Sequence, residues 1–140
     1  MKEKITIYTS ETCAYCDQVK EVLKENKLDF VEKSHIDFKK EWDEIIDLLG
    51  ANMLPTILYK DFYFSPGRDY QSPQDLANVL ENFESKEKYS IEHKILERLK
   101  TLNYSIHLAF RTTDSILRSI ENKLTILTTK DQENEHKSTS

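Results

Sequence analysis

The positions of glycine and proline constrain the fold of this 140-residue chain more than any other feature. The chain has only two glycines and three prolines, and all five lie between residues 50 and 73. These residues end or interrupt helices, and none of them occurs after Pro73. The chain after Pro73 can therefore form a long helix. The sequence therefore predicts a small domain over residues 1–85, a helical extension over 86–128 and a disordered polar tail over 129–140.

The composition indicates a folded domain and excludes several classes of partner. With 38% hydrophobic and 32% charged residues, the chain can bury a modest core. The net charge is −5 and the sequence has no basic block, so we expect no nucleic-acid partner. The start, "MKEKITIYTS", lacks the apolar core of a secretion signal, and we expect a cytoplasmic protein that does not bind membranes.

The hydrophobic periodicity of the first part predicts alternating strands and helices. "KITIYTS" and "DFVEKSHID" have the pattern of strands, whereas residues 14–28 and "KEWDEIIDLLGA" have helical spacing. "PTILYKDFYFS" predicts two strands joined at Lys60-Asp61, and "SPQDLANVLENF" predicts a helix capped by Ser72. The expected fold class is α/β with the order β-α-β-α-β-β-α, in which the first two strands are parallel and the last two form a hairpin.

The only two cysteines, Cys13 and Cys16, lie where the first strand is predicted to turn into the first helix. The free N–H groups of a helix start favour a thiolate, so the pKa of Cys13 is expected below its usual value of about 8.5. Three-residue spacing places both sulfurs on one helical face, within reach of a disulfide. We expect Cys13 to act as the nucleophile and Cys16 as the resolving thiol. A zinc site and two inert core thiols are the alternatives.

Residues 4–83 resemble the glutaredoxins. "ITIYTSETCAYC" is similar to the opening of that family, with Tyr15 matching its tyrosine and Thr12 standing where thioredoxins carry a tryptophan. "MLPT" at 53–56 falls at the place of the family's cis-proline. The resemblance implies a thioredoxin-like fold, a disulfide-containing protein as substrate, glutathione as co-substrate and no tightly bound cofactor. It further implies that Tyr15 belongs to the substrate-binding site and that Leu54 offers its backbone to glutathione beside cis Pro55. The alternative is a trans Pro55 that only starts a strand.

The glutathione-binding turn of the family corresponds to "SPGRDYQSPQD". The resemblance places Pro66-Gly67 at the family's Gly-Gly pair and Asp69 at its acidic residue, and Arg68 could supply a positive charge. A solvated Arg68–Asp69 pair in a surface loop is the alternative for these two residues. The helix start at Ser72 is a second candidate cradle for a carboxylate.

Two departures from the family bear on the chemistry. Ala14 replaces the proline of the family motif, which leaves open a glutathione-ligated iron–sulfur cluster that bridges two chains. Ser10 replaces the Lys or Arg that many relatives carry, while Glu11 and Asp17 flank the cysteines and Lys20 is the only nearby cation. The local charge therefore opposes ionisation of Cys13, and we predict a smaller lowering of its pKa than in a typical relative.

The extension carries an apolar stripe at heptad spacing. As one helix over 87–127 it would be about 60 Å long at about 1.5 Å per residue, more than the first domain can cover. Self-association into a homo-oligomer is the simplest way to bury the stripe, and docking on another protein or a break near "RTTDS" are the alternatives. The stripe consists of Leu99, Ile106, Thr113, Ile120 and Leu127, flanked by Ile95, Leu102, Ala109, Ile116 and Lys123, and by Leu96, Phe110, Leu117 and Leu124.

Two classes of function follow from these observations. The first is an enzyme, a glutathione-linked thiol-disulfide oxidoreductase that reduces protein disulfides or glutathione mixed disulfides. The second is an interaction protein whose helical extension does the work, with the first domain as a redox-gated or iron–sulfur-binding platform.

Overall fold

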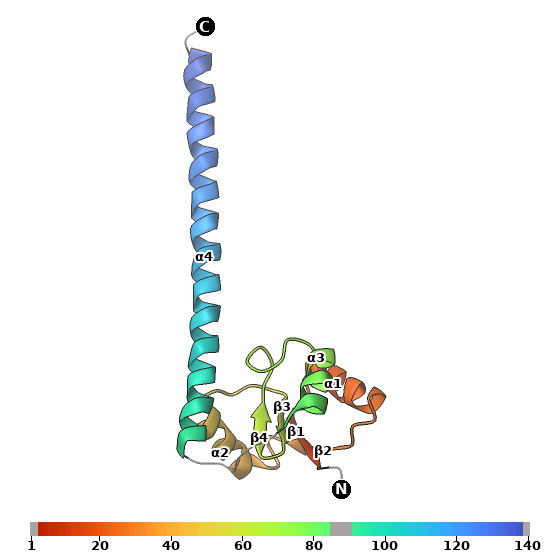
Figure 1. Cartoon of the computed structure of the whole chain (residues 1–140). Coiled ribbons are helices and arrows are strands. Elements are labelled where there is room, and N and C mark those ends of the chain that lie inside the picture. Colours follow the sequence, from red (N-terminus) through yellow and green to blue (C-terminus); the bar gives the residue numbers. More distant parts are fainter. Residues whose placement is uncertain (1–2, 85–90, 139–140) are drawn as a thin grey trace. The chain divides into compact units, whose positions relative to one another are not determined.

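The computed structural model describes residues 3–84 and 91–138, which form two compact units divided after Tyr104. The element order predicted for the first part is confirmed, and the arrangement is thioredoxin-like (Figure 1). The elements are β1 (Ile5–Thr9), α1 (Ala14–Glu25), β2 (Phe30–Ser34), α2 (Lys39–Leu49), β3 (Thr56–Tyr59), β4 (Phe62–Phe64), α3 (Pro73–Asn82) and α4 (Ile91–Ser138).

The four strands form one mixed sheet in the order β2-β1-β3-β4. β1 and β2 pair in parallel through the α1 crossover, whereas β3 is antiparallel to both β1 and β4. Lys60 and Asp61 form the β3–β4 turn with φ values of 49° and 63°, as the favoured two-residue hairpin turns require. Both the parallel pair and the hairpin were predicted.

The sheet separates two apolar clusters, because side chains alternate between the faces of a strand. Ile7 and Ile57 pack toward α1 and α3 on one face, whereas Tyr8 and Leu58 pack toward α2 on the other. Figure 1 shows α1 and α3 close together, with α2 apart from them. The largest cluster contains Ile5, Ile7, Val19, Leu23, Ile57, Phe64, Tyr70, Leu76 and Leu80.

Residue types at the helix ends explain where α2 and α3 stop and start. Gly50 ends α2 in the left-handed conformation with φ 73°, which glycine adopts without steric cost. The Ser72 hydroxyl accepts a hydrogen bond of 3.1 Å from the Asp75 N–H, and Pro73 follows at the first helical position. Both signals were predicted from the sequence.

The extension differs from its prediction at both ends. α4 runs without a break through "RTTDS" and continues to Ser138, so residues 129–138, expected to be disordered, are helical. The absence of glycine and proline explains both results, because nothing in this segment interrupts helical hydrogen bonding. The predicted boundary at 85 lies outside the described residues, and residues 91–104 of α4 belong to the first unit.

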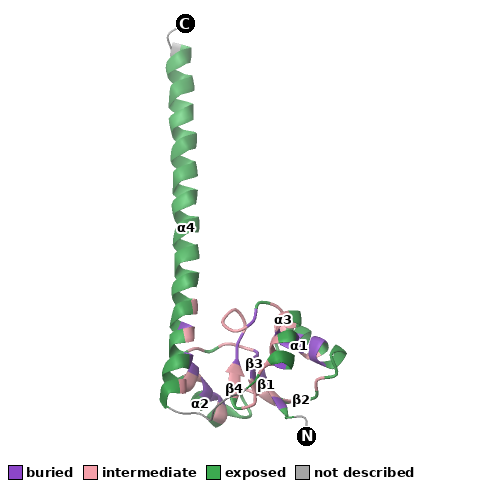
Figure 2. Cartoon of the chain, in the orientation of Figure 1, coloured by how far each residue is buried: buried purple, intermediate pink, exposed green. Residues whose placement is uncertain are grey.

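The shielded residues of α4 are polar, which reverses the usual pattern of an amphipathic helix. They recur at helical spacing on one face, and every residue from 105 to 137 is exposed (Figure 2). The apolar stripe stays exposed even over 95–102, where the opposite face is shielded. Within the described part of the chain, no helix has the length and apolar character needed to cross a membrane. The shielded residues are His93, Glu97, Lys100, Thr101 and Tyr104.

Candidate active site at the start of α1

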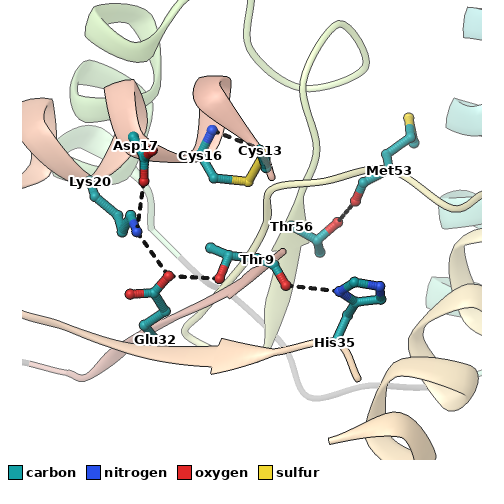
Figure 3. Close-up of a disulfide and its surroundings, with 9 residues drawn as sticks. All are labelled: Thr9, Cys13, Cys16, Asp17, Lys20, Glu32, His35, Met53 and Thr56. Carbon is teal, nitrogen blue, oxygen red and sulfur yellow. Dashed lines mark hydrogen bonds and ion pairs between the residues drawn. A yellow bond between two sulfur atoms is a disulfide. The ribbon is translucent and has the colours of Figure 1, made fainter. Parts of the chain in front are cut away.

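Cys13 and Cys16 form a disulfide with a Cα–Cα distance of 5.2 Å (Figure 3). Cys16 is completely buried in the first turn of α1, whereas Cys13 is partly exposed. Because an attacking thiolate must meet its substrate, the partly exposed Cys13 suits the nucleophile and the buried Cys16 suits the resolving thiol. The predicted pairing of the two cysteines is confirmed.

Cys13 is the N-cap residue of α1. Its Sγ accepts a hydrogen bond of 3.1 Å from the Cys16 N–H, one of the backbone donors that a helix start leaves without a partner. A donor at this place stabilises negative charge on the Cys13 sulfur when the pair is reduced. The strand-to-helix junction therefore supplies the electrostatic conditions for a thiolate.

Lys20, the cation nearest to the cysteines in the sequence, is paired with two carboxylates. Its Nζ lies 2.9 Å from both Asp17 Oδ1 and Glu32 Oε1, and the Thr9 hydroxyl donates to the same Glu32 oxygen at 2.7 Å (Figure 3). The hydrogen bonds from Lys20 and Thr9 lower the pKa of Glu32, and those to Glu32 and Asp17 raise the pKa of Lys20. Lys20 is therefore neutralised locally and offers little support to a thiolate on Cys13.

The segment before β3 lies near the cysteines. The Leu54–Pro55 peptide bond is cis, as predicted, and Figure 3 draws Met53 and Thr56 in the surroundings of the disulfide. The Thr56 hydroxyl donates to the Met53 carbonyl at 2.7 Å and contacts Ser65 Oγ at 3.2 Å. These contacts hold the segment, with Pro55 buried and Leu54 partly exposed.

A shallow groove of about 540 Å³ is lined by Tyr15, the residue directly before Cys16 in the chain. It brings together two of the predicted substrate-binding residues, Tyr15 and Leu54, and its size is in the range of small-ligand sites. Partial burial raises the pKa of Tyr15, so the phenol stays protonated at neutral pH. The lining residues are Tyr15, Asn52, Met53, Leu54, Pro66, Gly67, Gln71 and Tyr104.

Arg68 does not line the groove. Its side chain is 0% exposed, although its backbone remains partly accessible. Nε donates to Asp69 Oδ2 at 2.7 Å, Nη2 donates to the Tyr63 carbonyl at 2.9 Å, and Nη1 lies 2.7 Å from Glu97 Oε2 as an ion pair without hydrogen-bond alignment. The structure therefore shows neither the solvated surface pair nor the accessible cation considered from the sequence. Glu97, on the distant α4, is the partner that the sequence analysis missed.

The Asp69 carboxylate is likewise turned inward. It accepts from the Ser65 N–H at 2.8 Å and from Arg68, and burial raises the pKa of Asp69 while the adjacent guanidinium counteracts that effect. The other candidate cradle, at Ser72, contains the Asp75 carboxylate, which accepts from the Gln71 N–H at 2.9 Å. A second negative charge would meet repulsion there.

Sequence reasoning also missed four groove residues, Asn52, Met53, Gln71 and Tyr104. Tyr104 had no distinguishing signal, since its heptad position lies outside the apolar stripe and the chain has seven tyrosines. Gly67, with φ 76°, was predicted to form a turn, but its contact with Tyr104 depends on tertiary structure.

Comparison with known proteins gives three findings. A family model described as Glutaredoxin matches residues 5–63. An uncharacterized glutaredoxin-like 8.6 kDa protein in the rubredoxin operon of Clostridium pasteurianum is 38% identical over 53 residues, which cover 38% of this chain and 71% of that protein. The solved structure of the glutaredoxin-like protein NrdH-redoxin from Escherichia coli is 23% identical with a TM-score of 0.46, covering 59% of this chain and 99% of that one.

Proposed function

Because the chain belongs to the glutaredoxin family, we propose that its redox domain reduces protein disulfides or glutathione mixed disulfides, with glutathione as co-substrate. The observation that carries this proposal is the Cys13–Cys16 disulfide at the N-terminus of α1, in which residue Cys13 is partly exposed and Cys16 is buried. A thiol pair of this kind is suited to two-step thiol-disulfide exchange.

In the first step, the Cys13 thiolate attacks one sulfur of the substrate disulfide. The S–S bond of the substrate breaks, a mixed disulfide forms on Cys13, and the leaving thiolate takes a proton from water. Cys16 then loses its proton and attacks the Cys13 sulfur, which releases the second substrate thiolate. The substrate gains two electrons and two protons, and the enzyme is left with the Cys13–Cys16 disulfide.

Two glutathione molecules return the enzyme to its dithiol form in this proposal. The thiolate of the first attacks Cys13 Sγ and frees Cys16 as a thiolate, which is then protonated. The second attacks the sulfur of the glutathione bound to Cys13, releases Cys13 as a thiolate and leaves as glutathione disulfide. Electrons and protons balance across the two steps.

The predicted site residues have two kinds of role in this proposal: some contact the substrate and others hold the loop in place. Tyr15 and the backbone at Leu54, next to Pro55, contact the substrate from the groove. Arg68 and Asp69 act indirectly, because their buried ion pair fixes the loop that supplies Gly67 to the groove.

The thiol roles are tested with a glutathione mixed disulfide as substrate. Cys13→Ser is expected to lower turnover by about 10³-fold or more, whereas Cys16→Ser retains part of the glutathione-dependent activity, because the second thiol is needed only for the dithiol route. Replacing glutathione with a thioredoxin reductase identifies the electron donor. Equal activity of wild type and Cys13→Ser would contradict the proposal.

An iron–sulfur cluster shared by two chains is a second possibility for the same sulfur. Such a cluster needs thiolate ligands, and Cys13 is the accessible cysteine that each chain can offer when the pair is reduced. Visible absorption of protein purified without oxygen would favour the cluster, and its loss in Cys13→Ser would assign the ligand.

We also propose that the exposed stripe of α4 binds a second copy of this chain. The central positions are symmetric about Thr113, so in an antiparallel pair centred there Leu99 faces Leu127 and Ile106 faces Ile120. The pattern is thus complementary to itself, as a two-fold interface between identical chains requires.

The flanks of the stripe support the same antiparallel pairing. Ala109 comes opposite Leu117, a small side chain against a larger one, and Phe110 comes opposite Ile116, so apolar residues meet apolar residues at both places. In a parallel pair these positions would instead meet their own copies. The antiparallel homo-oligomer is therefore the arrangement that we propose.

A further inference from the structure

One wall of the groove comes from α4, a helix outside the residues that match the family model. Tyr104 lines the groove together with Gly67, and it is the last residue of the first compact unit. The tyrosine ring lies so close to the loop that a Cβ at position 67 would be 2.7 Å from its hydroxyl oxygen and 2.9 Å from Cζ. A larger residue at position 67 would force the Tyr104 ring to shift and would also have to adopt a φ of 76°, which glycine tolerates.

An ion pair between two buried side chains connects the same part of α4 to the loop. Glu97 is 1% exposed and lies 2.7 Å from Arg68, and Lys100 reaches the other Glu97 oxygen at 3.1 Å. Lys94 also pairs with Asp47 of α2 at 3.0 Å, in a contact that is exposed to solvent. Because a buried charge that loses its partner is costly, Tyr104 is held in place beside the groove.

The groove that results is electrically neutral. None of the described residues that line it has a charged side chain, and the nearest arginine of the loop, Arg68, is paired internally. Glutathione carries two carboxylates and one ammonium group, which would lose hydration here without gaining a counter-charge. An uncharged extended peptide loses less hydration free energy. Its side chains can pack on the Tyr104 ring, and its backbone can form hydrogen bonds with Gln71.

We propose that α4 supplies a wall of the substrate groove and that Tyr104 is a specificity-determining residue, which favours disulfides in uncharged, extended protein segments over glutathione mixed disulfides. This inference rests on the proposed function and narrows its substrate class. It assigns part of the extension to the site rather than to self-association alone.

The test compares two substrates with the same chromophoric leaving thiol on the full-length protein. One carries glutathione and the other carries an uncharged cysteine peptide. For Tyr104→Ala, kcat/KM for the uncharged peptide is expected to fall by about tenfold while that for glutathione changes less than about twofold, because only the peptide packs on the ring. Tyr104→Phe should keep the wild-type ratio, as should the neighbouring exposed control Asn103→Ala.

Tyr104→Lys provides a second test, in which the expected result is a gain of activity that a folding defect would not produce. A cation in the groove is expected to raise kcat/KM for the glutathione substrate by about fivefold, since it supplies the missing counter-charge. An unchanged substrate ratio in both Tyr104→Ala and Tyr104→Lys would overturn the assignment, as would a wild-type preference for glutathione.

Binding of an unreactive S-methyl form of each peptide, followed by NMR, separates this inference from the proposed function. One outcome is that the protein binds the uncharged peptide preferentially, that Tyr104→Ala weakens this binding, and that no turnover occurs. This outcome would support the groove assignment and overturn the oxidoreductase. Turnover with a peptide selectivity that does not depend on Tyr104 would support the oxidoreductase and overturn the groove assignment.

Discussion

Cys13 and Cys16 share one short motif but occupy different environments. Cys13 caps α1 and remains partly exposed, whereas Cys16 lies one turn further and is completely buried. Their different roles were predicted from position alone, because the first residue of a helix faces solvent and unpaired N–H groups. The complete burial of Cys16 depends on the tertiary structure.

The charge around Cys13 leads to a testable prediction. Ser10→Lys is expected to lower the Cys13 pKa by about half a unit, because a nearby positive charge stabilises the thiolate and Lys20 is already paired with Asp17 and Glu32. Ultraviolet thiolate absorbance of the reduced protein, titrated with pH, measures this value. Ser10→Gln is the matched neutral control, and equal pKa values in Ser10→Lys and wild type would contradict the electrostatic explanation.

At the scale of elements, the sequence predicted the helices and strands of the first part closely. The hairpin turn at Lys60-Asp61, the Gly50 helix end and the Ser72 cap all depend on local backbone preferences. The attachment of the start of α4 to the 65–71 loop was not predicted. It uses polar side chains, and hydrophobic periodicity carries no information about such contacts.

The buried Arg68–Glu97 pair is expected to contribute strongly to this attachment. Glu97→Gln should lower the free energy of unfolding by about 2–3 kcal/mol, because Arg68 loses one of its two carboxylate partners while Asp69 remains. Urea unfolding of the full chain measures the change. The exposed Glu121→Gln on the same helix should change it by less than about 0.5 kcal/mol. A Glu97→Gln midpoint equal to that of wild type would show that the pair contributes little.

At the scale of the whole molecule, the chain combines a redox domain with a helix whose apolar stripe the described residues leave exposed. The most exposed of the stripe's larger side chains, Phe110, is 71% accessible. An exposed stripe of this length is typical of an association surface. The second copy that we propose as partner would bury this stripe.

The antiparallel arrangement predicts the outcome of a charge exchange. Ile106→Glu alone and Ile120→Lys alone should each shift full-length protein toward monomer by about tenfold or more in dissociation constant, because each puts a charge in the apolar seam. Combined in one chain, they should restore association in part, since position 106 then faces position 120 of the other copy. Sedimentation velocity measures the change.

In a parallel pair the combined variant would place like charges opposite each other and weaken association further, which would overturn the antiparallel proposal. Arg118→Glu, on the opposite exposed face, is the matched control for adding a negative charge. A wild-type protein that sediments as a monomer at all concentrations would remove the second copy as the occupant of the stripe.

The sequence by itself determined the local structure and the chemistry of the cysteines. Element order, helix ends and the helix-capping position of Cys13 follow from preferences that act over a few residues. Only the tertiary structure decided what surrounds the groove: it buried Arg68, paired it with Glu97 and set Tyr104 against Gly67. Those contacts join residues that are distant in the chain, and their formation depends on packing and desolvation that no local pattern encodes.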